Sequence, residues 1–141
     1  MSGYLLDTNV ISEGVKLRPD LKVKAWVDSI DEQLFHVSVL TFGEIRKGIE
    51  SLPLSARRAT VESWLVHDLV VRFAGRILQV DQEVADRWGR LTGKAKAENR
   101  LLSGVEGLLA ATAFKHNLTL VTRNPRDVML SGVPVFNPWQ S

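Results

Sequence analysis

Acidic side chains stand at several points where short apolar runs of the chain end. Asp7 follows the run 4–6, Glu44 lies shortly after the run 33–39, and Asp127 follows the run 118–121. Glu106 lies one turn into the apolar segment that leads to the last of these runs. Three or four carboxylates within a few ångström repel one another, and a divalent cation with oxygen ligands, Mg²⁺ or Mn²⁺, relieves this repulsion. Such a site supports hydrolysis of phosphodiesters by metal-activated water.

The composition excludes several other kinds of site. The 141 residues include no cysteine, which excludes a disulfide scaffold, a thiolate metal site, a thiol nucleophile and an iron–sulfur cluster. Hydrophobic residues make up 45% and charged residues 24%, with a net charge of +2, which indicates one globular domain, 1–141. No apolar run is long enough for a membrane span, and the N-terminus lacks a basic signal-peptide region. We therefore expect a cytoplasmic protein that makes no membrane contact.

Strands and helices alternate along the predicted chain. Apolar and β-branched runs predict strands at 4–6, 33–39, 77–80, 118–121 and 133–136. Helical spacing of apolar residues predicts helices at 21–30, 41–52, 55–74, 81–95 and 104–116. We expect a turn at 7–9 and a loop at 122–126. This order favours an α/β fold with a mainly parallel sheet that is covered on both faces, and the carboxyl ends of its strands would bring the acids together.

Each acid also has a purely structural interpretation. The patterns Thr41-x-x-Glu44 and Ser103-x-x-Glu106 both fit a capping box, in which the glutamate satisfies a backbone N–H at the helix start. Asp7 fits a local turn. These interpretations stay open at the level of the sequence, and only the matching positions of several acids favour a shared site.

Four segments of the chain resemble the motifs of the PIN domain, in family order. They are Leu-Leu-Asp-Thr-Asn-Val at 5–10, Ser-Val-Leu-Thr-Phe-Gly-Glu-Ile at 38–45, Glu-Gly-Leu-Leu-Ala-Ala-Thr-Ala at 106–113 and Leu-Val-Thr-Arg-Asn-Pro-Arg-Asp at 120–127. More narrowly, the chain is similar to VapC-type toxins of toxin–antitoxin pairs. The segments 84–89 and 137–139 resemble the FitB-like branch of these toxins most closely.

This resemblance implies a three-layer α/β/α sandwich and an Mg²⁺-dependent endoribonuclease that a cognate antitoxin holds inactive. It also implies a homodimer. Asp7 and Glu44 match the first two acids of the family directly. Glu106 stands where the family usually has aspartate, so it keeps the charge on an arm that is longer by one methylene.

The last motif supplies the remaining candidates at the site. Asn124 occupies a place where some members carry aspartate, and its amide is a weaker metal ligand. Asp127 can supply the fourth acid, directly or through water. Thr122 and Asn9 can contribute hydrogen bonds, although ordinary turn chemistry explains these two residues as well.

Basic residues near these acids are candidates for holding the phosphates of RNA. Arg46 and Lys47 follow Glu44 within one turn, and Arg123 comes just before Asn124. A solvated helix face is an equal alternative for each. The predicted helical hairpin 41–74 carries apolar side chains that cover the sheet or, as the resemblance implies, form a groove for an antitoxin helix.

Two functions other than a nuclease remain as alternatives. The same fold can bind RNA or an antitoxin without cutting, because Glu106 and Asn124 depart from the family pattern. An aspartyl-phosphate hydrolase with Asp7 as nucleophile is the weaker alternative, because that chemistry usually needs a second aspartate where Asn9 stands.

Overall fold

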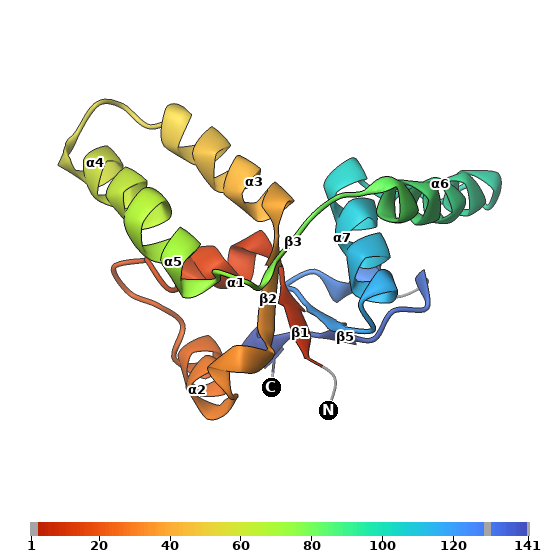
Figure 1. Ribbon diagram of the computed structural model, residues 1–141, viewed down its shortest axis with the longest axis horizontal. Helices are drawn as coiled ribbons and strands as arrows, with labels where there is room; N and C mark the ends of the chain where they lie inside the picture. The colour runs from red at the N-terminus through yellow and green to blue at the C-terminus, as the bar shows by residue number, and fades with distance from the viewer. Residues whose placement is uncertain (1–2, 129–130, 141) are drawn as a thin grey trace.

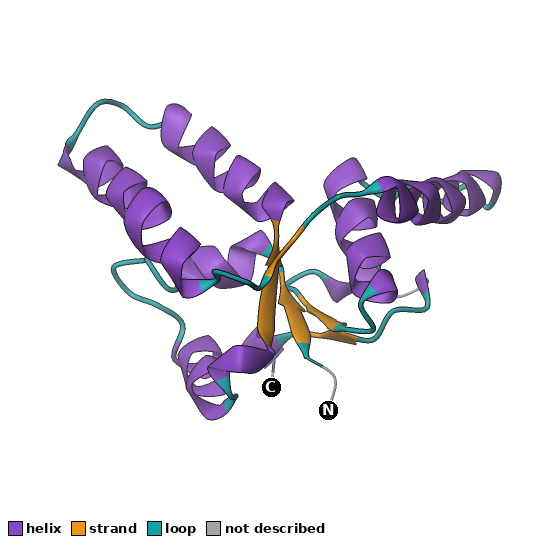
Figure 2. Cartoon of the chain, in the orientation of Figure 1, coloured by secondary structure: helices purple, strands orange, loops and turns teal. Residues whose placement is uncertain are grey.

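A five-stranded parallel sheet forms the centre of the molecule (Figure 2). The computed structural model describes residues 3–128 and 131–140. The strand order is β3-β2-β1-β4-β5, and every pair of neighbouring strands is parallel. The strands are β1 (Tyr4–Leu6), β2 (Phe35–Ser38), β3 (Ile77–Leu78), β4 (Thr119–Val121) and β5 (Val135–Phe136). All five predicted strands are present, although four of them are shorter than the sequence pattern suggests.

Helices cover both faces of the sheet (Figure 1). Adjacent residues of a strand point to opposite faces. Leu6 packs into the core under α1 (Thr8–Glu13) and under the helical hairpin, whose first arm is α3 (Val39–Glu50), whereas Leu5 packs into the core under α7 (Gly104–Lys115). The predicted three-layer α/β/α sandwich is therefore confirmed. The helices are α1 (Thr8–Glu13), α2 (Leu21–Ser29), α3 (Val39–Glu50), α4 (Ala56–Ser63), α5 (Val70–Arg72), α6 (Gln82–Ala97) and α7 (Gly104–Lys115).

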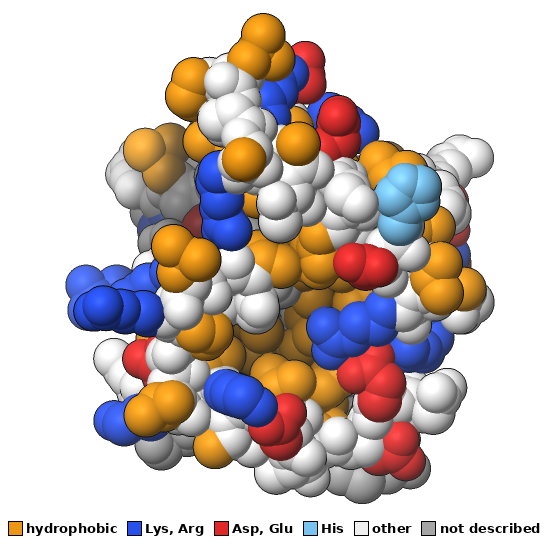
Figure 3. All heavy atoms as spheres, turned by 90° about the vertical axis from the view of Figure 1, so that its left-hand side faces the viewer, with side chains coloured by type: hydrophobic (Ala, Val, Ile, Leu, Met, Phe, Trp, Pro, Cys, Tyr) orange, Lys and Arg blue, Asp and Glu red, His pale blue; other side chains and the backbone are white. Residues whose placement is uncertain are grey.

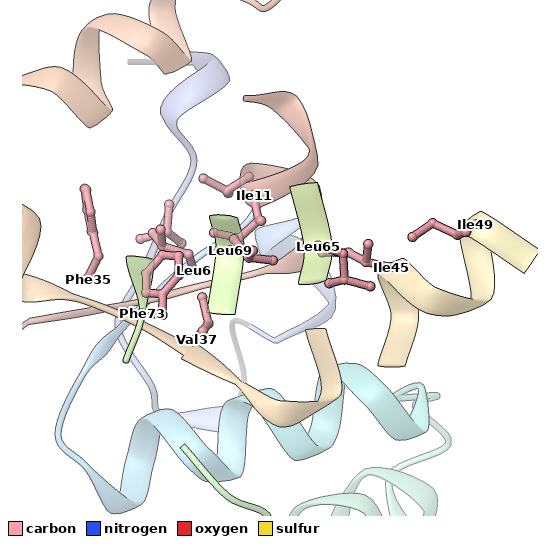
Figure 4. Packing of buried hydrophobic residues seen from close by; sticks show 11 residues of the cluster. Leu6, Ile11, Phe35, Val37, Ile45, Ile49, Leu65, Leu69 and Phe73 are labelled. Atoms are coloured by element: carbon pink, nitrogen blue, oxygen red, sulfur yellow. The ribbon is translucent and has the colours of Figure 1, made fainter. Parts of the chain in front are cut away.

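The predicted long helix at 55–74 is one continuous helical arm with a π-helical stretch, Trp64–Leu69, between α4 and α5. Leu65, Leu69 and Phe73 are buried at intervals of four residues. Residues four apart lie on the same side of a helix, so these three side chains share the face that packs against the core. These side chains meet Ile45 and Ile49 of α3 beside the sheet (Figure 4). Much of the hairpin's apolar surface therefore belongs to the core.

Three local differences from the sequence prediction concern a helix that was expected as a turn, the start of α3 and a 3₁₀ turn inside a loop. Residues 8–13 form the helix α1 where we expected only a turn, because Asp7 acts as its N-cap. The helix α3 begins at Val39, two residues earlier than expected, because the Ser38 hydroxyl accepts a hydrogen bond from Leu40 N–H. The expected loop contains a short 3₁₀ turn, Pro125–Asp127. Among the residues that the structure describes, no helix is long and apolar enough to cross a bilayer.

Candidate functional site

Asp7 leaves the carboxyl edge of the sheet at the end of its central strand. The register pairs Leu6 of β1 with Val121 of β4, so the residues that follow, Asp7 and Thr122, leave the same edge side by side. The Thr122 hydroxyl donates to Asp7 Oδ2 at 2.8 Å, and Thr8 N–H donates to Asp7 Oδ1 at 2.7 Å. The two bonds hold the carboxylate in one orientation.

Glu44 reaches the same edge from α3, the helix that follows the neighbouring strand. Its Oε1 atom accepts a hydrogen bond of 2.5 Å from the Thr8 hydroxyl, and that hydroxyl shares a second hydrogen bond of 3.1 Å with Thr41. The Thr41 side chain is fully buried. Because Ser38 rather than Thr41 caps α3, Glu44 lies in the second turn of the helix and is not part of a capping box. The structural interpretation of Glu44 as a cap is therefore wrong.

The carboxylates of Asp7 and Glu44 repel each other when both are charged. Burial raises the pKa of Asp7 above its ordinary value, and the nearby charge of Glu44 raises it further. The hydrogen bonds from Thr122 and from Thr8 N–H act in the opposite direction and favour the charged form. A buried aspartate that faces a second carboxylate is the environment that a divalent cation stabilises, so these two residues fit a hard metal ion.

Glu106 lies at the start of α7, the helix that leads into β4. In a parallel crossover this helix start lies at the same edge of the sheet as Asp7, and α7 contacts β1. Glu106 N–H donates to the Ser103 hydroxyl at 3.1 Å, so Ser103 is a true N-cap and this half of the capping box is present. The Glu106 side chain is half-buried.

The fourth candidate acid follows β4. The backbone of Asp127 ends the short 3₁₀ turn, and its side chain lies outside what the structure describes. Asn124 is exposed, and its backbone N–H donates to the Thr122 hydroxyl at 3.2 Å. Thr122 is almost fully buried, and its backbone N–H donates to Phe136 O in β5. Thr122 therefore connects the Asp7 carboxylate to the loop that carries both of these candidate ligands.

The structure brings together only part of the predicted acidic set. Within the described ranges, no group of three or more His, Asp or Glu side chains is close enough to hold a metal ion. The direct observation is the pair Asp7 and Glu44, coupled through Thr8. The predicted roles of Glu106, Asp127 and Asn124 as metal ligands remain predictions.

Asn9, two residues after Asp7 in the chain, carries an unsatisfied polar group. Its side-chain oxygen Oδ1 is buried and has no hydrogen-bond partner among the residues described here. A buried amide oxygen without a donor costs free energy, and a metal ion or its water would satisfy it. This observation supports the predicted contribution of Asn9 to the site.

The three candidate RNA-binding cations differ in their surroundings. Arg46 of α3 forms an ion pair with Glu62 of α4, so its guanidinium is directed toward the other arm of the helical hairpin. Arg123 lies over the ring of Trp139, 5.1 Å from the ring centroid. Lys47 is exposed and lines a hollow together with Glu44. Contact with RNA stays a prediction for all three, and the geometry favours Lys47.

Thr8 and Thr41 are the site residues that the sequence analysis missed. In the sequence, Thr8 is the middle residue of Asp-Thr-Asn, and Thr41 fits the pattern of a helix cap. Their hydroxyls meet across 33 residues of chain. A short-range sequence pattern cannot predict a contact between residues so far apart in the chain. The usable signals are the hydroxyl of Thr8 next to Asp7 and the hydroxyl of Thr41 three residues before Glu44.

Sequence comparison places this architecture among known proteins. A sequence model of the PIN domain matches residues 4–129. The chain is 36% identical over 135 residues to Toxin FitB of Neisseria gonorrhoeae, and the aligned region covers 96% of this chain and 97% of that protein. It is 32% identical over 136 residues to the VapC ribonuclease Y4jK of Sinorhizobium fredii, with coverage of 96% and 97%.

Solved structures show the same relationship in three dimensions. The crystal structure of FitAcB from Neisseria gonorrhoeae matches with a TM-score of 0.91 and 36% identity, over 98% of this chain and 99% of that one. FitAB bound to a DNA fragment also matches with a TM-score of 0.91, at 34% identity over 96% and 95%. VapBC2 from Rickettsia felis, at 18% identity and a TM-score of 0.77 over 95% and 97% of the two chains, supports the fold alone.

Proposed function

Because the chain belongs to the PIN-domain family, we propose that it is a metal-dependent endoribonuclease and the toxin of a toxin–antitoxin pair. One observation carries the proposal. Asp7 and Glu44 follow two neighbouring parallel strands, and both accept hydrogen bonds from Thr8 at the carboxyl edge of the sheet, Asp7 from its backbone N–H and Glu44 from its hydroxyl. Relatives at 36% and 32% identity are named a toxin and a ribonuclease, which supports this assignment.

Asp7 and Glu44 are the residues that would hold the divalent metal, Mg²⁺ or Mn²⁺. The unsatisfied Asn9 oxygen and the unfavourable proximity of the two acids support this fit. Glu106, Asp127 and Asn124 would complete the ligand set from the other side of the site. When bound, the metal lowers the pKa of a water molecule and stabilises negative charge on the phosphate that is cleaved.

Three hydrogen bonds from the chain's own residues prepare the site. Thr122 and Thr8 N–H each bind one oxygen of Asp7, so the free lone pairs of this carboxylate keep a fixed direction. The Thr8 hydroxyl orients Glu44 in the same manner. Hydrogen bonds to a carboxylate ligand raise the precision of a metal site, and their loss typically costs about 10- to 100-fold in affinity or activity.

The proposed partners are RNA as substrate, a second copy of the chain and a cognate antitoxin protein. A hollow of about 230 Å³ opens beside α1 and α2, with Val10, Ile11 and Val23 among its apolar lining. Figure 3 shows this face, with hydrophobic side chains on the hollowed floor and charged side chains around it. Such a surface fits the apolar face of an antitoxin helix. The structures of FitAB and FitAcB support a protein partner for this chain.

Cleavage of total RNA by the purified chain tests the nuclease proposal. The protein is separated from any co-purified antitoxin under denaturing conditions, refolded, and incubated with RNA in EDTA, Mg²⁺ or Mn²⁺. We expect cleavage only with added metal and none by Asp7→Asn. Refolded protein that binds Mg²⁺ in calorimetry but leaves every RNA intact would contradict the nuclease and favour a binding module instead.

A further inference from the structure

A second hollow adjoins the proposed catalytic site. It measures about 560 Å³ and is lined by residues of α3 and by Val105 at the start of α7. Figure 1 shows where these two helices lie. Glu44 is part of its wall, so a molecule in the hollow would touch a proposed metal ligand directly. The remaining lining residues are Val39, Leu40, Gly43, Lys47, Gly48, Ser51 and Val105. From Leu40 to Ser51 the hollow follows α3 for about 16 Å, which is three helical turns.

Two glycines keep this hollow open without any structural need for glycine. Gly43 and Gly48 lie inside α3 with negative φ, and a Cβ atom at either position would meet nothing within 4 Å. Glycine weakens a helix interior relative to alanine. Both glycines therefore make α3 less stable than alanine would, although no described neighbour occupies the space in which a Cβ atom would lie.

Lys47 is the cation in this wall. Within the described part of the chain it makes no ion pair, whereas its neighbour Arg46 is bound to Glu62. Lys47 follows Glu44 by three residues, which places it on the same helical face about 4.5 Å further along the axis. A free ammonium group thus stands one turn beyond the carboxylate that would hold the metal and the reacting phosphate.

We propose that this hollow is a nucleotide subsite for the RNA substrate. The nucleotide next to the cleaved bond places its base and sugar against the aliphatic wall of Val39, Leu40 and Val105, and Lys47 binds its phosphate. This inference rests on the proposed nuclease function, because it takes Glu44 as the position of the reacting phosphate. The wall offers no aromatic ring and few polar groups, so we expect little base preference here.

The charges of the hollow favour RNA over a protein partner as its occupant. A phosphodiester chain needs a cation one step away from the metal, and the unpaired Lys47 beside Glu44 provides that alternation of charge. A protein segment would need polar partners of its own for both groups. The hollow also adjoins Glu44, a proposed metal ligand, so an RNA chain bound at the metal can extend directly into it.

Binding of a short RNA without metal tests the subsite independently of cleavage. Anisotropy of a fluorescein-labelled, single-stranded RNA of about ten nucleotides, a length within the usual site sizes, is measured in EDTA at several KCl concentrations. Lys47→Met should weaken binding about tenfold at low salt and reduce the slope of log K against log salt by about 0.7, the value for one lost phosphate contact. Lys22→Met, an exposed lysine of α2, removes the same charge and should keep the slope.

Gly43→Leu tests the shape of the hollow separately from its charge. A Cβ atom at this position meets nothing within 4 Å, and the leucine side chain beyond it would extend into the space proposed for the base. We expect RNA affinity to fall several-fold with an unchanged salt slope, and the melting temperature should not decrease, because leucine favours a helix more than glycine.

The outcomes separate this inference from the nuclease proposal. If the wild-type chain cleaves RNA while Lys47→Met and Gly43→Leu bind RNA normally, the subsite is wrong and the nuclease stands. If no RNA is cleaved but both variants lose RNA affinity, the hollow binds RNA without serving a cleavage site, and the nuclease proposal fails. If Gly43→Leu changes only the sedimentation mass or the affinity for the antitoxin, the hollow is a protein interface and the inference is overturned. An equal slope change in Lys22→Met would also overturn it.

Discussion

The two sides of the acidic edge are built differently. On one side, Asp7 and Glu44 are tied by hydrogen bonds to Thr122 and Thr8, which hold both carboxylates in place. On the other side, Glu106 lies in the first turn of α7, where its N–H is bound by the Ser103 cap, and the backbone of Asp127 ends a short 3₁₀ turn. The first side is held by hydrogen bonds between residues far apart in the chain, and these bonds are present without any metal.

The contrast between Glu44 and Glu106 shows how similar sequence patterns acquire different roles. Both follow the spacing of a capping box, yet only Ser103 caps its helix in that register. Ser38 takes the cap of α3, and this shift of the helix start releases Glu44 from local bonding and directs it to Thr8. The metal-binding role is therefore expected to be strongest on the first side.

Glu44→Gln should have the largest effect. The amide keeps the size of the side chain but loses its charge, so we expect cleavage of RNA to fall by more than about 100-fold, beyond the usual cost of losing a ligand's hydrogen-bond partner. Single-turnover cleavage in Mg²⁺ measures this loss. Glu50→Gln on the exposed face of the same helix is the matched control. Equal rates for the two variants would show that Glu44 takes no part in the chemistry.

Glu106→Gln should have an intermediate effect. Glutamine can still serve a capping box and offers an amide oxygen to the metal, so we expect a loss of about 10- to 100-fold in activity. Glu98→Gln, at an exposed ion pair with Arg100, is its control. Full activity in Glu106→Gln would mean that this residue is only a helix cap, and the two sides would then differ in function as well as in structure.

Thr122→Val should have a smaller effect on activity. The change keeps the volume and removes the hydroxyl that donates to Asp7, so metal affinity should fall by about tenfold, the low end for such partners. Isothermal titration with Mn²⁺ measures the affinity. Thr112→Val removes an equally buried hydroxyl that bonds only within α7, and it should bind metal normally. Unchanged affinity in Thr122→Val would argue against organisation of the first side by hydrogen bonds.

The smallest effect concerns stability without metal. The pKa of Asp7 is raised above 3.8 in the folded chain by burial and by Glu44. The protonated form is therefore favoured on folding, and this contribution is lost as pH rises through the raised pKa. We expect Asp7→Asn to gain melting temperature relative to wild type as pH increases from about 4, the pKa of a free aspartate. Melting curves in EDTA would contradict this if the difference stayed constant with pH.

Much of the architecture was predictable from local sequence patterns. Each strand is a short apolar run, and each helix except α1 shows apolar residues at helical spacing or a recognisable cap. The alternation of strands and helices then requires parallel crossovers. For this reason, the sequence pattern alone predicts that Asp7 and Glu44 lie at one edge of the sheet. The helix α1 was missed because a strand that is followed at once by an N-cap looks like a turn.

The sequence by itself determined which residue types stand at the ends of the strands, because periodicity and capping are local properties of the chain. Only the tertiary structure decided which of these groups touch. The bond between Thr8 and Glu44 joins residues 36 positions apart, and that between Thr122 and Asp7 joins residues 115 positions apart. Such contacts depend on the register of β1 with β4 and on where α3 begins, and these follow from packing of the whole sheet and its helices.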